Sequence, residues 1–233
     1  MNTIVLIPGY MCNEELWKYQ IKELKKKYRV IIPNLKKGKT IKEFSSNTLK
    51  ILPNKFSIIG FSMGGFVALN LSINYHKRVE KLILVGTNGR SVSGSRKLLL
   101  DKLQNELDNK NYIEKFSSNS FNSYFIKSNQ KNRQYLKLIR SMVKRLGYLC
   151  LKRQTHAILT RPNLLNKLSK INARCLIIAG SQDRLSSKEM NIELHNKIKN
   201  SELFFITKSG HFTMIEQTKK FNKKILNWLD RSD

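Results

Sequence analysis

The sequence predicts an α/β protein with about six mainly parallel strands, helices on both faces of the sheet and one helical insertion. Short β-branched runs alternate with helical patterns at both ends of the chain. These runs are apolar at consecutive positions, which is typical of strands in a parallel sheet covered on both faces. Between residues 89 and 162 the alternation stops and helical patterns follow one another.

Six runs of four or five residues have the composition of buried strands. They are Thr3–Ile7, Val30–Pro33, Phe56–Ile59, Lys81–Val85, Cys175–Ala179 and Leu203–Thr207. Helical patterns, with apolar residues three or four positions apart, connect or follow these runs. They are Glu14–Tyr28, Thr40–Leu52, Phe66–Tyr75, Lys188–Ile198 and Glu216–Asp230.

The insertion contains helical patterns and no convincing strand. The patterns are Arg96–Asn109, Gln134–Leu146 and Tyr148–Leu159, with a Ser/Asn-rich link predicted over Ser117–Ser123. We expect a core of residues 1–88 and 163–233 and an inserted helical lid of residues 89–162. With 233 residues, the chain is long enough for one domain with an insertion and short for two ordinary domains.

Composition indicates a soluble cytoplasmic protein. The three cysteines are odd in number and lack metal-ligand spacing, which favours free thiols in a reducing compartment. The chain shows no basic leader and no run of ~18 apolar residues, so neither a signal peptide nor a membrane anchor is expected. We expect no metal and no organic cofactor.

The formal net charge of +28 comes mainly from 32 lysines, which are spread from Lys18 to Lys224. Clusters such as Lys25–Lys27 fall on polar helix faces, where lysine side chains are ordinarily solvated. This charge raises affinity for polyanions at low salt. Its even spread nevertheless indicates a solvated surface, so no specific nucleic-acid partner is expected.

Ser62 lies in the motif Gly60-Phe61-Ser62-Met63-Gly64-Gly65, between a predicted strand and a predicted helix. A serine on such a tight turn has the setting of a nucleophile elbow. The turn places the serine at positive φ, and the residues two before and two after it must be small. Gly60 and Gly64 meet that requirement, and we predict Ser62 as the nucleophile.

A serine hydroxyl needs a general base, and the base needs an orienting carboxylate. Of four histidines, His211 alone follows a predicted strand in a glycine-preceded loop; the other three fall in or beside helical patterns. Of five aspartates, Asp183 alone sits just past a predicted strand, where a turn or helix N-cap is its alternative role. The chain order Ser62, Asp183, His211 agrees with a triad at the carboxyl edge of one sheet.

The oxyanion of a tetrahedral intermediate needs hydrogen-bond donors. We predict the backbone N–H of Met63, at the start of the elbow helix, and that of Tyr10, in the loop after the first strand. Cys12 lies beside this loop without a second base, which favours a packed free thiol.

The chain resembles the α/β-hydrolase superfamily along nearly its whole length. The motifs that carry the resemblance are Leu6-Ile7-Pro8-Gly9 with Cys12 and Trp17, Gly60 to Gly65, Arg78-Val79, Gly180 with Asp183, Gly210-His211, and Glu216. The chain is also similar to a bacterial branch called α/β-fold hydrolases, through Leu6-Ile7-Pro8-Gly9-Tyr10-Met11-Cys12 together with Arg153-Gln154-Thr155 and Arg161-Pro162. Relatives with a comparable helical lid include the carboxylesterase that demethylates pimeloyl-carrier-protein esters.

The chain also departs from the family pattern. Pro8 stands where many members have histidine, and Ser187 and Thr218 replace prolines. The chain starts at the strand that leads into the oxyanion loop, so the usual opening antiparallel hairpin is expected to be missing.

A lid above Ser62 would exclude water and shape the substrate pocket. The candidate substrate contacts are Met11, Phe125, Met142, Arg161 and Phe212. Most apolar lid residues are expected to be packing contacts. Arg161 is a candidate to hold a substrate carboxylate, and a structural ion pair is the alternative for this residue.

These residues predict a serine hydrolase that cleaves a small or medium carboxylic ester or thioester through an acyl-enzyme. Two alternatives stay open. The same fold can host a lyase, a C–C hydrolase or an esterase for a coenzyme A thioester or an acidic acyl carrier protein. The chain could also be a basic binding protein with a vestigial triad.

Overall fold

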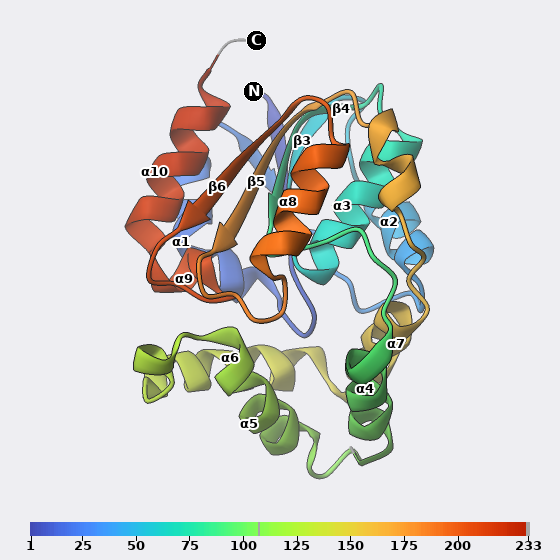
Figure 1. Ribbon diagram of the computed structural model, residues 1–233, viewed down its shortest axis with the longest axis vertical. Helices are drawn as coiled ribbons and strands as arrows, with labels where there is room; N and C mark the ends of the chain where they lie inside the picture. Colours follow the sequence, from blue (N-terminus) through green and yellow to red (C-terminus); the bar gives the residue numbers. More distant parts are fainter. Residues whose placement is uncertain (107, 232–233) are drawn as a thin grey trace.

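Six parallel strands form one sheet in the computed structural model, which describes residues 1–106 and 108–231 (Figure 1). The strands are β1 (Thr3–Ile7), β2 (Arg29–Ile31), β3 (Phe56–Phe61), β4 (Val79–Val85), β5 (Arg174–Gly180) and β6 (Ser201–Ile206). Their order is β2-β1-β3-β4-β5-β6, and each neighbouring pair is parallel. The predicted α/β class and mainly parallel sheet are confirmed, and the sheet of the described residues contains no antiparallel hairpin.

The strands in the middle of the sheet are buried and those at its edges are not. Every residue of β1 and β3 is buried, whereas β2 and most of β6 are partly exposed. Phe204 on β6 is 37% exposed, as expected for a strand with one unpaired edge. This explains why the central strands read as continuous apolar runs.

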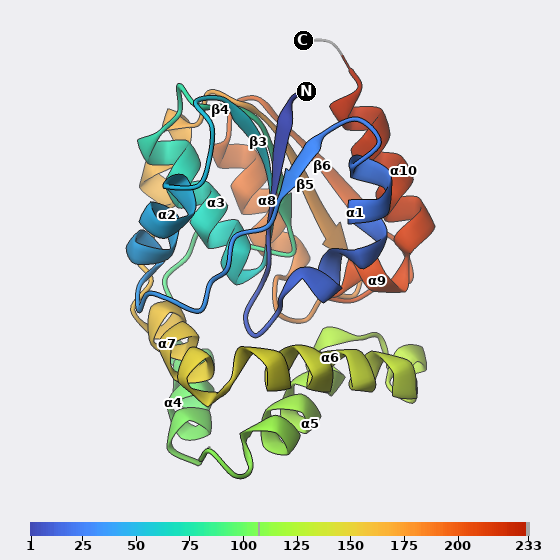
Figure 2. The same ribbon diagram turned by 180° about the vertical axis from the view of Figure 1, so that it is seen from behind.

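Helices cover both faces of the sheet (Figures 1 and 2). On one face lie α1 (Lys18–Leu24), α9 (Thr213–Glu216) and α10 (Thr218–Leu229); on the other lie α2 (Ile41–Leu49), α3 (Met63–Asn74) and α8 (Lys188–Lys197). Ten of the twelve residues of α3 are buried, because α2 and the sheet enclose it. The elbow helix is therefore fixed from several sides.

The insertion lies across the carboxyl ends of the strands, while both chain termini lie at the opposite end (Figure 2). Its elements are α4 (Gly94–Glu106), α5 (Tyr112–Tyr124), a 3₁₀ turn at Lys127–Asn129, α6 (Arg133–Leu146) and α7 (Tyr148–Leu159). The Leu164 N–H donates to the Gly89 carbonyl at 2.7 Å, which joins the points where the chain leaves the core and returns. A 3₁₀ helix at Leu165–Lys170 then leads into β5.

The predicted link Ser117–Ser123 is wrong, because these residues belong to α5. Phe116, Phe121 and Tyr124 are buried on one side of this helix, and their burial outweighs the low helix propensity of serine and asparagine. The pattern Glu14–Tyr28 begins as a 3₁₀ turn at Glu14–Trp17 before α1. Glu216–Asp230 is split, since α9 ends at Glu216 and α10 begins at Thr218. The end of the pattern Arg96–Asn109 includes residue 107, which lies outside the described residues.

In the part of the chain that the structure describes, the helices are too short or too polar to cross a membrane.

Candidate active site

Ser62 occupies a sharp turn between β3 and α3. Its backbone has φ 51° and ψ −114°, a conformation that L-residues rarely adopt. The Ser62 N–H donates to the Val85 carbonyl at 2.9 Å, and the Thr87 hydroxyl donates to the Ser62 carbonyl at 2.8 Å. The strained backbone is therefore held from the neighbouring strand β4 and the loop that follows it.

The two elbow glycines lie where backbones pass closely. A Cβ on Gly64 would overlap the carbonyls of Ile7 and Pro8 at the end of β1. A Cβ on Gly60 would stand 2.7 Å from the Cβ of Ala68. Both positions therefore exclude any larger residue, in agreement with the steric reasoning from sequence.

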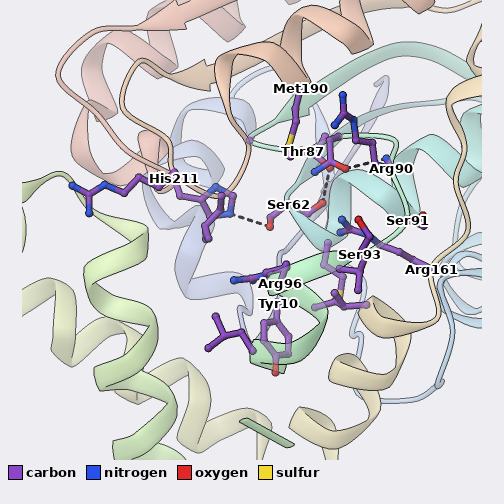
Figure 3. Close-up of a pocket in the computed structure, with 18 of the residues that line it drawn as sticks. Tyr10, Ser62, Thr87, Arg90, Ser91, Ser93, Arg96, Arg161, Met190 and His211 are labelled. Atoms are coloured by element: carbon purple, nitrogen blue, oxygen red, sulfur yellow. Dashed lines mark hydrogen bonds between the residues drawn. The ribbon is translucent and has the colours of Figure 1, made fainter. Parts of the chain in front are cut away.

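The structure brings Ser62, His211 and Asp183 into one hydrogen-bonded chain, and Figure 3 shows its Ser62–His211 part. His211 Nε2 lies 3.0 Å from Ser62 Oγ, and His211 Nδ1 lies 2.8 Å from Asp183 Oδ2. An ionised carboxylate only accepts, so Nδ1 carries the proton and Nε2 is free to accept from the serine hydroxyl. This geometry allows a proton to move from Ser62 Oγ to the imidazole.

Asp183 is fixed by the loop after β5. Its Oδ1 accepts from the N–H groups of Leu185 at 2.8 Å and Ser186 at 3.0 Å, which leaves Oδ2 for His211. The Ser186 hydroxyl donates to the Thr87 carbonyl at 2.7 Å. The loop of the acid is thus tied to the loop that supports the elbow. Asp183 does form a turn, as its alternative role suggested, and it does so while contacting His211.

The loop of His211 is held by Glu216 and by the insertion. Glu216 Oε2 accepts from the Gly210 N–H at 2.6 Å, and Oε1 accepts from the Ile126 N–H at 3.0 Å and from Asn129 at 2.9 Å. The imidazole itself is 3% exposed and packs against Phe61, with ring centroids 4.8 Å apart. In the sequence Glu216 contributes only to the family resemblance, whereas its contacts in the structure give it a positioning role.

Tyr10 and Met63, whose backbone N–H groups are the predicted oxyanion donors, both line the space in front of Ser62. Among the described residues neither N–H has a hydrogen-bond partner, so both are free to donate to an oxyanion. The next N–H, of Met11, is occupied by Gln154 Oε1 at 2.8 Å, and Met11 has a positive φ of 52°. The loop that contains Tyr10 and Met11 is therefore held by a side chain from the insertion.

Gln154 and Thr155 were not predicted as site residues. Gln154 holds Met11, and the Thr155 hydroxyl lies 2.5 Å from the Tyr10 hydroxyl. Both are buried on α7 beside Leu151 and Ile158. The sequence signal that could have found them is the presence of two polar residues on the apolar side of a helical pattern. Buried polar side chains need hydrogen-bond partners, so such residues are candidates for specific contacts.

A cavity of about 580 Å³ opens onto Ser62 and His211 between the core and the insertion (Figure 3). Of the five candidate substrate contacts, Arg161 lines this cavity, and its contact with a substrate stays a prediction. The other four candidates lie outside its described lining, in packed interior: Met11, Phe125, Met142 and Phe212. Phe125 and Phe212 pack together with ring centroids 5.3 Å apart, so this pair joins the insertion to the loop of His211.

The cysteines are buried free thiols. Burial raises the pKa of the Cys12 thiol above its usual range, and its Sγ faces the Tyr10 carbonyl at 3.4 Å. Such a thiol is a poor nucleophile. Within the described residues, no group of three or more His, Cys, Asp or Glu side chains is placed to hold a metal ion.

A six-stranded parallel sheet, a strained Ser62 after β3, and Asp183 and His211 on later strand-end loops define the class of α/β hydrolases. Residues 49–218 match the family described as alpha/beta hydrolase fold, and the chain belongs to that family.

Similar proteins are known as sequences and as structures. A 2-hydroxy-6-oxononadienedioate/2-hydroxy-6-oxononatrienedioate hydrolase from Pseudomonas putida is 28% identical over 76% of this chain, which spans 63% of that relative's length. A thermophilic esterase from Thermogutta terrifontis superposes with a TM-score of 0.86 at 22% identity, covering 98% of this chain and 89% of the esterase. A meta-cleavage product hydrolase from Pseudomonas fluorescens superposes with a TM-score of 0.81 at 19% identity, covering 99% and 91%.

Proposed function

We propose that the protein is a serine hydrolase that cleaves a small or medium carboxylic ester or thioester. The observation that carries this proposal is the chain of hydrogen bonds from Ser62 Oγ through His211 to Asp183 at the floor of an open cavity. The family supports hydrolysis, and the esterase among the structural neighbours supports an ester bond.

In the proposed reaction, Ser62 Oγ attacks the acyl carbon while His211 Nε2 takes the hydroxyl proton. Asp183 holds the imidazole and stabilises its charged form. The N–H groups of Tyr10 and Met63 donate to the oxyanion. His211 then protonates the leaving alcohol or thiol. A water molecule, deprotonated by His211, attacks the acyl carbon, and His211 returns that proton to Ser62 Oγ as the bond to the acid breaks. The insertion serves as a lid that keeps bulk water from the acyl-enzyme.

The test is the Ser62→Ala variant. We expect it to lose hydrolysis of 4-nitrophenyl butyrate and labelling by a fluorophosphonate probe, while its circular dichroism and melting temperature stay close to those of the parent protein. Because the hydroxyl is the attacking group, turnover at the parental rate by a folded Ser62→Ala protein would refute the proposal. An unlabelled, folded parent protein would favour a binding protein with a vestigial triad.

A second candidate is hydrolysis of a C–C bond by the same residues, which the names of the Pseudomonas relatives support. Supplying 2-hydroxy-6-oxononadienedioate beside 4-nitrophenyl butyrate separates the two candidates. A higher kcat/KM for the dioate would favour C–C hydrolysis, and a higher value for the ester would favour the first proposal.

A further inference from the structure

The cavity in front of Ser62 is cationic. Its described lining contains no aspartate or glutamate. It contains four arginines, which are Arg90, Arg96, Arg161 and Arg184. Arg90 is paired with Glu193 at 2.8 Å, and Arg184 is exposed to solvent. The charge that faces the interior of the cavity therefore comes from Arg96 and Arg161.

Arg161 is the more enclosed of these two. It stacks on Phe66, with its guanidinium carbon 4.4 Å from the ring centroid, and its Nε is buried without a hydrogen-bond partner. Burial and the neighbouring Arg96 lower the pKa of Arg161 to about 10, so the guanidinium still carries its charge at neutral pH. A buried cation is unfavourable unless an opposite charge accompanies it.

No carboxylate of the described residues accompanies either arginine. The structural ion pair considered for Arg161 is therefore not made within the described chain. Both side chains extend from the insertion, Arg96 from α4 and Arg161 from the segment after α7, toward the space beside Ser62 (Figure 3). Ser91 and Ser93 border the same space.

We propose that the cavity binds a substrate that carries a carboxylate, held by Arg161 and Arg96, with its scissile carbonyl at Ser62. This proposal rests on the proposed function, since it names the substrate class of the same site. A guanidinium offers paired N–H donors that match a carboxylate, and the enclosed position strengthens the attraction. Val92, Leu99 and Ile158 line the remaining wall and suit a short aliphatic chain between the two groups.

The experiment compares matched esters. Mono-4-nitrophenyl adipate and 4-nitrophenyl hexanoate share six acyl carbons and a leaving group, and they differ in the terminal carboxylate. A second pair, 4-acetoxybenzoate and 4-acetoxybenzamide, places the carboxylate on the alcohol side. The variants are Arg161→Met, Arg96→Met, the charge-retaining Arg161→Lys, and Arg133→Met, which removes an exposed arginine outside the cavity.

We expect the parent protein to prefer the carboxylate ester of one pair in kcat/KM by at least about tenfold. Arg161→Met and Arg96→Met should each reduce that preference by at least about tenfold, Arg161→Lys should retain part of it, and Arg133→Met should leave it unchanged. The pair that shows the preference identifies the acyl or the alcohol side. We also expect Arg161→Met to melt no lower than the parent, because it removes a buried charge without a partner.

Equal kcat/KM values within both pairs would overturn the proposal. It would also be overturned if Arg161→Met melted at a lower temperature than the parent and lost kcat/KM by the same factor for both members of a pair. If inorganic phosphate inhibited competitively and adipate did not, the assignment of a carboxylate as the bound group would also be overturned. Fluorophosphonate labelling and calorimetric binding of mono-4-nitrophenyl adipate to Ser62→Ala separate the two proposals. If Ser62 is labelled but neither ester pair shows a carboxylate preference, only the carboxylate-binding proposal is refuted. If mono-4-nitrophenyl adipate binds but Ser62 of the parent protein is not labelled, only the proposed hydrolase function is refuted.

Discussion

Both carboxylate oxygens of Asp183 accept hydrogen bonds at this site. Its two oxygens accept three hydrogen bonds, two from backbone N–H groups of its own loop and one from His211. The backbone bonds fix the carboxylate before any substrate binds, so the imidazole is oriented in the resting protein. Asp183 thereby favours the His211 tautomer with its proton on Nδ1, which leaves Nε2 free for Ser62.

Asp183→Asn should therefore lower kcat on the order of 10³-fold to 10⁴-fold while the protein remains folded. The amide keeps the size of the carboxylate, but it no longer favours the proton on Nδ1 or stabilises the imidazolium. Steady-state kinetics on 4-nitrophenyl butyrate measure the effect. The matched control is Asp101→Asn on α4, outside the described cavity lining, and a similar rate for both variants would contradict the role of Asp183.

The insertion contributes to the site through specific elements as well as by covering it. Helix α7 supplies Gln154 to the Met11 N–H, and the end of α5 supplies the Tyr124 carbonyl to the Phe212 N–H at 3.2 Å. Glu216 joins the loop of His211 to Ile126 and Asn129. The loop of Tyr10 and Met11 and the loop of His211 are thus both tied to the insertion between β4 and β5.

Replacing Gln154 by Leu should lower kcat on the order of 10-fold to 100-fold with a smaller change in KM. The substitution leaves the Met11 N–H without its acceptor, and the positive φ of Met11 then lacks its support. The Tyr10 N–H would no longer be held toward the oxyanion. His156→Leu, an exposed position on the same helix, is the control. Equal kinetics for the two variants would show that α7 does not position the loop.

The molecule as a whole has one continuous hydrophobic core that extends from the sheet into the insertion. The three cysteines lie in this core, at Cys12 beside β1, Cys150 on α7 and Cys175 on β5. Burial raises the pKa of Cys150 to about 11 and those of the other two further. The thiolate fraction of each is therefore very small at neutral pH.

Most of the thiols of the folded protein should accordingly stay unreacted with dithionitrobenzoate at pH 8, whereas all three should react in guanidinium chloride. The physical reason is that a thiol reacts as the thiolate, which both burial and the raised pKa suppress. Absorbance at 412 nm counts the released thiolate. Rapid modification of one thiol before unfolding would show that the core opens near that residue, and mass spectrometry would identify it.

Most of the fold could be predicted from the sequence because it depends on local patterns. The continuous apolar runs specify central strands of a parallel sheet, and Gly60, Ser62 and Gly64 specify the elbow from steric requirements alone. Strand order was not predictable in this way, since edge strands such as β2 have weak patterns. The helix over Ser117–Ser123 was missed because its stability comes from buried aromatic residues and not from its serines.

The class of fold and the grouping of Ser62, Asp183 and His211 could be predicted from the sequence alone, because strand ends of a parallel sheet meet at one edge and few residues of the required types follow them. Which side chains face the cavity depends on the three-dimensional packing. Met11, Phe125, Met142 and Phe212 pack inside, while Arg96 and Arg161 face the space beside Ser62 without carboxylate partners in the described chain. Packing between distant segments sets these directions, and local sequence patterns do not contain that information.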